Sequence, residues 1–236
     1  TLKFDDQNNQ LIITDANNLL VTSIFGANGN NSNSTTIPIT SFSGENIIFN
    51  GGAGDDVLIV DFSLGEFTKN IIFNGEGQTK GDELVLTGGS FDTVTHSLTN
   101  ANDGSIDLDG ITITYTGLEP ISDYNVAVNR VFEFTGAAET ITLSDNGISD
   151  DGFSLIDSTL GESVAFANPT GALTINTTTG SGTDFINVER LDSSFDANLN
   201  IITDRDTGEE DVVTFQTNTL DLGTGALYVT GDEIQL

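Results

Sequence analysis

The chain has 236 residues, enough for one large domain or two small ones. Its 36 Asp and Glu residues stand against 6 Lys and Arg, a formal net charge of −30. Such a surface repels nucleic-acid phosphates, so we expect no nucleic-acid partner. Cys is absent, which excludes disulfides and zinc–thiolate sites. No apolar run reaches the roughly 20 residues of a membrane-spanning helix, so we expect no membrane span.

Short clusters of β-branched and aromatic residues follow one another along the chain and predict β-strands. Gly, Asn, Asp, Ser and Thr separate the clusters, and no segment has the pattern of a capped amphipathic helix. The sequence therefore predicts an all-β chain. The predicted strands cover residues 10–14, 18–25, 46–50, 56–62, 82–87, 111–116, 131–135, 139–143, 184–188, 211–215 and 226–230.

An internal repeat indicates how these strands are arranged. The sequence Asn-Ile-Ile-Phe-Asn-Gly at residues 46–51 recurs 24 residues later at 70–75. Looser copies begin at residues 173, 199 and 227. A repeat of this length cannot bury its apolar face alone and must stack on its neighbours. We therefore predict a parallel β-helix, or β-solenoid, with coils of about 24–28 residues, in which Asn50 lies beside Asn74.

Two features leave the architecture open. Regular short strands are also typical of a β-sandwich, which is the alternative fold. Asp109-Gly110 favours a two-residue hairpin turn within residues 105–116, so the stack is not expected to be purely parallel. Residues 117–130 separate two sets of repeats, which predicts a first half at 1–122 and a second half at 123–236, or one continuous domain.

An acid stands just before the second strand of most repeats. Calcium takes six to eight hard oxygen ligands, largely from carboxylates and carbonyls. Stacked turns would bring such acids together, so the sequence predicts calcium as the bound ion. The alternative is that each acid caps its own turn by accepting backbone N–H groups. The predicted calcium ligands form two groups, Asp55, Asp56, Asp82 and Glu83 in the first half, and Asp184, Asp204, Asp206 and Asp211 in the second.

Residues 51–59, Gly-Gly-Ala-Gly-Asp-Asp-Val-Leu-Ile, resemble one nonapeptide of the calcium-binding repeats in haemolysin-type toxins. In that family, turn carbonyls and an Asp, here Asp56, bind calcium. The wider layout of the coils, with residues 113–120 and 185–201 between them, resembles repeat modules of large bacterial extracellular and surface proteins of the adhesin type. This resemblance implies a secreted or cell-surface, calcium-rich architecture without enzymatic activity.

The sequence contains few of the residue types that usually carry out catalysis. His96 is the sole histidine, and no Ser-His-Asp set or phosphate-binding loop can be assembled around it. The six Lys and Arg residues do not cluster, and carboxylates are too common to indicate a glycosidase pair. We therefore expect no enzyme, no catalytic residues and no organic cofactor. A polysaccharide-active β-helix enzyme and a glycan-binding module are the alternatives.

The two ends of the sequence bear on its partners. The chain starts with Thr1 rather than Met, which predicts a processed product or a piece of a longer protein. Both ends read as strands, and free strand edges invite pairing. We expect a structural or adhesive module that pairs end to end, with adjoining repeats of a larger parent protein or with copies of itself in a filament or surface layer. Cell-surface or matrix glycans are further candidate partners.

Overall fold

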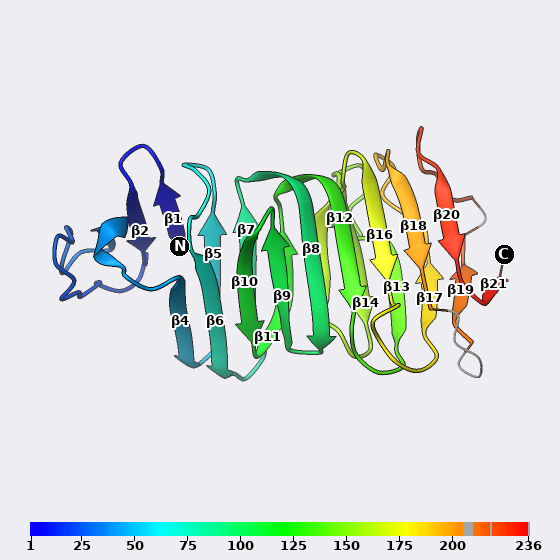
Figure 1. Cartoon of the computed structure of the whole chain (residues 1–236), viewed down its shortest axis with the longest axis horizontal. Helices are drawn as coiled ribbons and strands as arrows, with labels where there is room; N and C mark the ends of the chain where they lie inside the picture. The colour runs from blue at the N-terminus through cyan, green and yellow to red at the C-terminus, as the bar shows by residue number, and fades with distance from the viewer. Residues whose placement is uncertain (205–209, 218, 236) are drawn as a thin grey trace.

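The computed structural model describes residues 1–204, 210–217 and 219–235, and these are almost entirely β (Figure 1). The helical structure in the described part is a single 3-10 turn, Ile39–Ser41. Within these residues no helix is long and apolar enough to span a membrane. The prediction of an all-β chain is confirmed.

The strands form two sheets. In the described residues the first sheet has twelve strands, in the order β21-β19-β17-β13-β14-β15-β11-β7-β5-β1-β2-β3. They are β1 (Leu2–Asp5), β2 (Gln10–Thr14), β3 (Ser34–Pro38), β5 (Val57–Asp61), β7 (Asp82–Thr87), β11 (Leu118–Asp123), β13 (Thr140–Asp145), β14 (Phe153–Ser158), β15 (Val164–Ala167), β17 (Phe185–Val188), β19 (Val212–Phe215) and β21 (Glu233–Gln235).

The second sheet has nine strands in the described residues, in the order β20-β18-β16-β12-β8-β9-β10-β6-β4. They are β4 (Asn46–Ala53), β6 (Asn70–Gly77), β8 (Ser90–Asn100), β9 (Asp103–Leu108), β10 (Ile111–Thr116), β12 (Val126–Phe134), β16 (Ala172–Asn176), β18 (Asn198–Ile202) and β20 (Leu227–Thr230). In most repeats the chain passes from a strand of this sheet to one of the twelve-stranded sheet, as from β4 to β5.

Neighbouring repeats pair in parallel, with equal residues side by side. Ile47 pairs with Ile71 and Phe49 with Phe73, as the repeated sequence predicts. Asn50 pairs with Asn74, whose Nδ2 donates a hydrogen bond to Asn50 Oδ1 at 2.7 Å. The predicted pairing of these two asparagines is therefore confirmed. In the second half, β16, β18 and β20 continue the same parallel register.

Antiparallel hairpins interrupt the parallel pairing. β9 lies antiparallel between β8 and β10, and β14 between β13 and β15. The turn from β9 to β10 is the predicted Asp109-Gly110 pair, with φ angles of 51° and 99°. These positive φ angles suit Gly and are tolerated by Asp, which confirms the predicted hairpin. β14 and β15 were not predicted as strands.

The core lies between the two sheets. Alternate residues of each strand point inward, so that Ile71 and Phe73, Ile113 and Tyr115 are buried while the residues between them are more exposed. One apolar cluster runs from Leu2 to Leu222. Both sheets continue across residue 122, within β11, and the division of the chain there stays a prediction.

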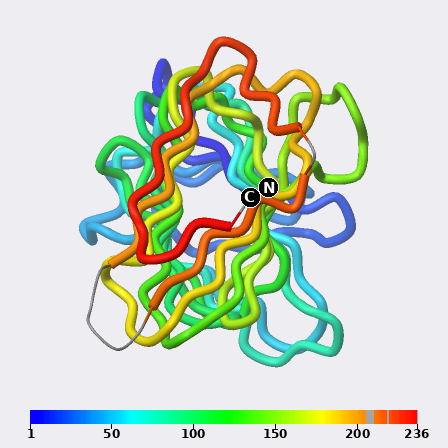
Figure 2. Tube along the Cα trace, turned by 90° about the vertical axis from the view of Figure 1, so that its right-hand side faces the viewer, coloured from blue at the N-terminus to red at the C-terminus, as the bar shows by residue number. Residues whose placement is uncertain are grey.

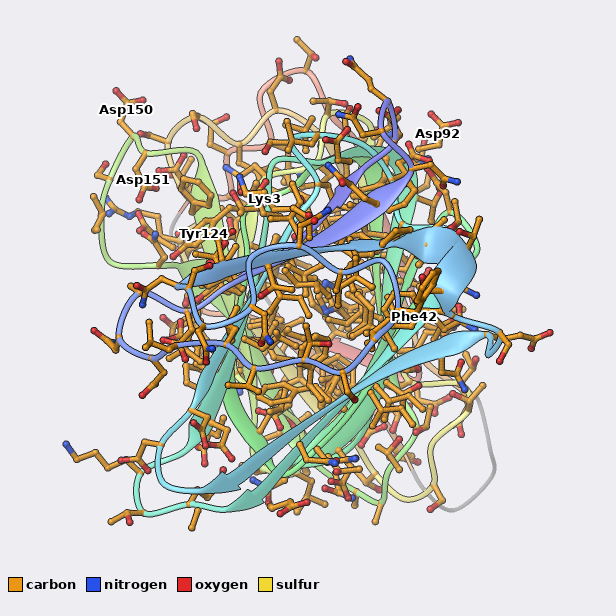
Figure 3. The ribbon with its side chains drawn as sticks, turned by 90° about the vertical axis from the view of Figure 1, so that its left-hand side faces the viewer. Lys3, Phe42, Asp92, Tyr124, Asp150 and Asp151 are labelled. Carbon is orange, nitrogen blue, oxygen red and sulfur yellow. The ribbon has the colours of Figure 1, made fainter. Side chains whose placement is uncertain are left out.

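The two ends of the stack differ. At the N-terminal end, which faces the viewer in Figure 3, β1, β2 and β3 extend the twelve-stranded sheet beyond β5, with β2 and β3 antiparallel. The strand predicted at residues 18–25 is wrong, because this segment is an irregular loop with one isolated bridge from Leu20 to Ser32. At the C-terminal end, β20 and β21 (red in Figure 2) are the last described strands.

Replacing Ile113 by Ala should reveal the buried face of the nine-stranded sheet. Ile113 is fully buried, so the cavity should cost about 2–5 kcal/mol of unfolding free energy. Ile48 is 59% exposed on the outer face of the same sheet, so Ile48→Ala should cost less than about 1 kcal/mol. Urea denaturation measures both. Equal losses would contradict the inward and outward assignment of this sheet.

Candidate functional site

Acidic residues line up where strands of the twelve-stranded sheet begin. β5 pairs in parallel with β7, and Val57 lies beside Glu83. The acids one position earlier, Asp56 and Asp82, are therefore neighbours. The same applies to β13, β17, β19 and β21. Neighbouring strands lie about 4.8 Å apart, so these acids form two rows at that spacing, and β11, β15 and β14 lie between the two rows. We call the two rows together the acid column; the first row is Asp56 and Asp82, and the second is Glu139, Asp184, Asp211 and Asp232.

One oxygen of several column carboxylates caps the coil before it. Asp82 Oδ1 accepts the backbone N–H of Asp56 at 2.7 Å. Asp184 Oδ1 accepts that of Glu139 at 3.0 Å, and Asp211 Oδ1 accepts that of Asp184 at 2.8 Å. The sequence left open that each acid accepts backbone N–H groups of its own turn. One oxygen of each of these three acids does accept a backbone N–H, but the N–H belongs to the neighbouring repeat.

The second oxygen of several of these carboxylates has no hydrogen-bond partner. Oδ2 of Asp56, Asp82 and Asp211 is buried without a hydrogen-bond partner, and so is Oδ1 of Asp204. A buried anionic oxygen without a partner costs several kcal/mol, which a bound proton or cation removes. These oxygens are hard ligands of the kind that calcium prefers.

Glycines make room for the carboxylates in the first half. A Cβ on Gly75 would lie 2.3 Å from Asp82 Oδ2 and 2.5 Å from the carbonyl oxygen of Gly117. A Cβ on Gly51 would lie 3.1 Å from Asp56 Oδ2. The repeated glycine within β4 and β6 is thus explained by two neighbours, the acid of the same repeat and a carbonyl oxygen of the next, which for Gly51 is that of Gly75 at 2.9 Å.

The column carries strongly perturbed acids. Burial raises the pKa of Asp184 to about 6, and the charges of Asp211 and Glu139 add to this rise. Burial also raises the pKa values of Asp211 and Glu139. The hydroxyl groups of Thr177 and Thr203 oppose the rise at Asp184 and Asp211, respectively. Like charges stacked in a buried row therefore favour uptake of a proton or a cation.

The structure brings together only some of the predicted calcium ligands. Asp56 lies beside Asp82, and Asp184 beside Asp211. Asp204 is close enough for its charge to raise the pKa of Asp211. Asp206 lies outside the described residues.

Two predicted ligands are engaged elsewhere. Asp55 is exposed, and its Oδ1 accepts the backbone N–H groups of Thr79 and Lys80 at 2.9 and 2.7 Å. Glu83 follows Asp82 on the strand and points to the opposite face, where it accepts a hydrogen bond from the Ser122 hydroxyl at 3.3 Å. No three His, Cys, Asp or Glu side chains of the described part converge at metal-binding distances, and calcium stays a prediction.

Glu162 is a buried acid that sequence reasoning missed. It stands two residues before β15, is 1% exposed, and neither of its carboxylate oxygens has a hydrogen-bond partner. Burial raises its pKa to about 9, and the charges of Glu119 and Asp103 add to the rise. The signal was an acid before a strand, but Val-Ala-Phe-Ala at β15 is too weakly apolar to be recognised as one.

His96 belongs to a second buried cluster. Its Nε2 lies 3.1 Å from Asp123 Oδ2, and Arg130 makes an ion pair with the same oxygen. All three side chains are fully buried, and the His96 ring stacks on Phe132. Burial favours a raised pKa at Asp123, but the charge of Arg130 and the His96 hydrogen bond hold it at about 2. The cluster ties β8, β11 and β12 together.

Comparison with known proteins gives no match: no family model, no curated protein and no solved structure matches this chain. The acid column is therefore the candidate functional site on its own geometry.

The raised pKa of Asp184 predicts a pH-dependent stability in the absence of divalent cations. The folded state binds this proton more tightly than the unfolded state, so its stabilisation is complete below about pH 4 and is lost as the pH rises through about 6. The unfolding free energy should fall by up to about 1.4 kcal/mol per pH unit and per proton in this window. Urea denaturation in chelator between pH 4.5 and pH 7 measures the slope.

Asp184→Asn should flatten this slope, because Asn keeps the oxygen that accepts the Glu139 N–H but does not titrate. Asp157 is exposed on β14 and is the matched control, since Asp157→Asn should leave the slope unchanged. Parallel slopes for the wild type and Asp184→Asn would show that Asp184 does not titrate as its surroundings imply.

Proposed function

We propose that this chain is a non-enzymatic structural or adhesive module of a secreted or cell-surface protein, folded as a parallel β-helix and stabilised by calcium. The β-helix is supported by the alternation of the chain between two sheets and by parallel partners 24 to 28 residues apart. Asn46 pairs with Asn70, Leu173 with Leu199, and Leu199 with Leu227. A β-sandwich of the immunoglobulin type would pair its strands antiparallel.

The uncovered last coil is the observation that carries the functional proposal. Leu227 and Ile234 pair with Leu199 and Val213, which are fully buried. Leu227 is nevertheless 40% exposed and Ile234 49% exposed, because no described segment lies beyond them. The outer edges of β20 and β21 are also unpaired in the described residues. An apolar face with two free strand edges favours addition of another coil.

The partner we propose for this face is a further β coil, from an adjoining repeat of a larger parent protein or from another copy of the chain. The N-terminal end is less suited to the same contact, because β1, β2 and β3 already extend the twelve-stranded sheet there. The sequence predicts open strand edges at both ends, and the assembly proposed here uses the C-terminal one.

A charge on the apolar end face should prevent self-association. We expect the wild type to form concentration-dependent oligomers, and Leu227→Lys with Ile234→Lys to stay monomeric, as measured by size-exclusion chromatography with light scattering. Ile148→Lys is the control, because Ile148 is 64% exposed on a loop away from this end. A wild type that stays monomeric at every concentration would remove self-assembly from the proposal.

Calcium fits the acid column by donor chemistry. Asp56 and Asp82 would hold one ion through their unpartnered Oδ2 atoms, and the unpartnered oxygens of Asp204 and Asp211 would hold a second, with carbonyl oxygens and water completing each shell. The chain as a whole has a large excess of acidic over basic residues, and this negative charge further favours the binding of cations. The ion would act structurally, by neutralising carboxylates of neighbouring coils and so linking one coil to the next.

Millimolar calcium should raise the melting temperature above its value in chelator. An ion that binds only the folded state at 100 times its Kd adds about 2.7 kcal/mol. Asp82→Asn and Asp211→Asn keep the capping oxygen and should each reduce the calcium-dependent rise, whereas Asp157→Asn should not. A rise that sodium chloride reproduces at equal ionic strength would reduce the effect to charge screening.

A further inference from the structure

The loop between β2 and β3 exposes four large apolar side chains. The exposed fractions are 62% for Leu19, 76% for Val21, 38% for Ile24 and 95% for Phe25. The loop lies at the left-hand end of the molecule in Figure 1, and β20 and β21 lie at the opposite end. A terminal cap of a β-solenoid ordinarily presents a polar outer face to water. This loop does the reverse, so it has the character of a contact surface.

Hydrogen bonds hold the loop in one shape while these side chains face solvent. Asn33 Nδ2 donates to the carbonyl oxygens of Asp15 and Asn18 at 3.0 and 2.9 Å, which closes the base of the loop. The Ser41 hydroxyl donates to the carbonyl oxygen of Phe25 at 2.9 Å. A surface that is already ordered loses little conformational entropy when a partner binds, which favours binding.

The loop belongs to an uncharged segment of a strongly acidic chain. Residues 16–44 contain no Asp, Glu, Lys, Arg or His, whereas the formal net charge of the chain is −30. Two copies of such a chain repel each other wherever acids face acids. An uncharged segment is therefore the place where a second copy can approach at the lowest electrostatic cost.

The open C-terminal coil is the matching surface on the second copy. Leu227 and Ile234 are half-exposed, although the corresponding residues of the preceding strands are fully buried. Residues 222–231 are also free of charged residues. Figure 2 shows this end, with β20 and β21 in red. One end of the molecule thus leaves apolar core positions uncovered, and the other end presents apolar side chains that can cover them.

Contact between unlike ends is favoured over contact between like ends. Asp232 and Glu233 adjoin the C-terminal face, so two C-terminal faces would bring acids of both copies together. Opposite the loop, the same two acids meet an uncharged segment. Unlike surfaces at opposite ends of a molecule make a heterologous contact, which continues from copy to copy into a filament unless it closes into a ring.

We propose that the apolar loop of one copy docks on the open last coil of the next copy, with Val21 and Phe25 packed against Leu227 and Ile234. The occupant of each surface is thus a second copy of this chain. This inference rests on the function proposed above, because it names the surface that meets the open C-terminal end. A contact through a few side chains belongs to the weak class of interfaces, so assembly requires a high protein concentration.

Two double variants, each with one surface blocked, test this arrangement. Val21→Asp with Phe25→Asp blocks the loop. Leu227→Asp with Ile234→Asp blocks the last coil, and the use of Asp at both ends makes the blocked surfaces repel each other. By size-exclusion chromatography with light scattering, each variant alone should be monomeric at concentrations where the wild type associates. An equimolar mixture should form a dimer of one copy of each and nothing larger, because it has one intact pair of surfaces. Ile148→Asp is the control and should associate as the wild type does.

The outcomes separate this inference from the proposed function. Association of the loop variant alone would overturn the docking on the loop, but it would leave the open C-terminal end as an assembly surface. A mixture that stays monomeric while the wild type associates would also overturn the docking. A wild type that is monomeric at every concentration would overturn this inference and would leave only adjoining repeats of a parent protein as partners. Unchanged melting temperatures of the variants show that they are folded.

Single thiols locate the contact. The chain has no Cys, so Ser23→Cys and Thr230→Cys each introduce one thiol. Both positions are exposed, Ser23 in the loop and Thr230 at the end of β20. Mild oxidation of the mixture should give mainly disulfide-linked dimers that join one variant to the other. A statistical distribution of the three possible dimers would show random collision and overturn the assignment.

A lipid surface is the other ligand to which an exposed apolar loop can bind. Flotation with neutral phosphatidylcholine vesicles should leave the wild type unbound. Binding to these vesicles that Val21→Asp with Phe25→Asp abolishes, without self-association of the wild type, would assign the loop to a membrane surface and overturn the proposal.

Discussion

Parallel stacking in register is the constraint on which the rest of this structure depends. It places equal positions of successive coils about 4.8 Å apart, so each residue type must tolerate its own kind as a neighbour. Ile47 beside Ile71 and Phe49 beside Phe73 gain apolar contact, and Asn50 beside Asn74 gains a hydrogen bond. The same rule applied to Asp gives neighbouring carboxylates, which repel.

The acid column shows how the fold accommodates that repulsion. Asp82, Asp184 and Asp211 each accept a backbone N–H of the neighbouring coil, so each negative charge has a fixed donor. Glycines beside Asp56 and Asp82 leave room for the second oxygen. Burial and the charges of Asp211 and Glu139 still raise the pKa of Asp184, so part of the cost of placing these carboxylates together remains. The column is therefore a place where stacking geometry is coupled to the protonation of carboxylates and, in our proposal, to calcium binding.

The sequence predicted what depends on local periodicity. The paired repeats, the asparagine contact and the turn at Asp109-Gly110 all follow from spacing and residue type. It could not predict contacts between residues that share no period, such as His96 with Asp123 and Arg130, which are 27 and 34 residues away. Asp55 and Glu83 lie apart from the column for two different reasons. Asp55 stands in the turn before β5, where it accepts backbone N–H groups of Thr79 and Lys80. Glu83 follows Asp82 on β7, and adjacent residues on a strand face opposite ways.

The buried ion pair also has a mechanical consequence. Each repeat pairs mainly with the repeats on either side of it, so a force applied at the C-terminus would separate β20 and β21 first and then proceed repeat by repeat. Arg130, Asp123 and His96 join strands on both sides of residue 122 and are fully enclosed, so separating them would leave charges without partners in the interior. The molecule is thus built to yield in steps from its open end and to resist at its middle.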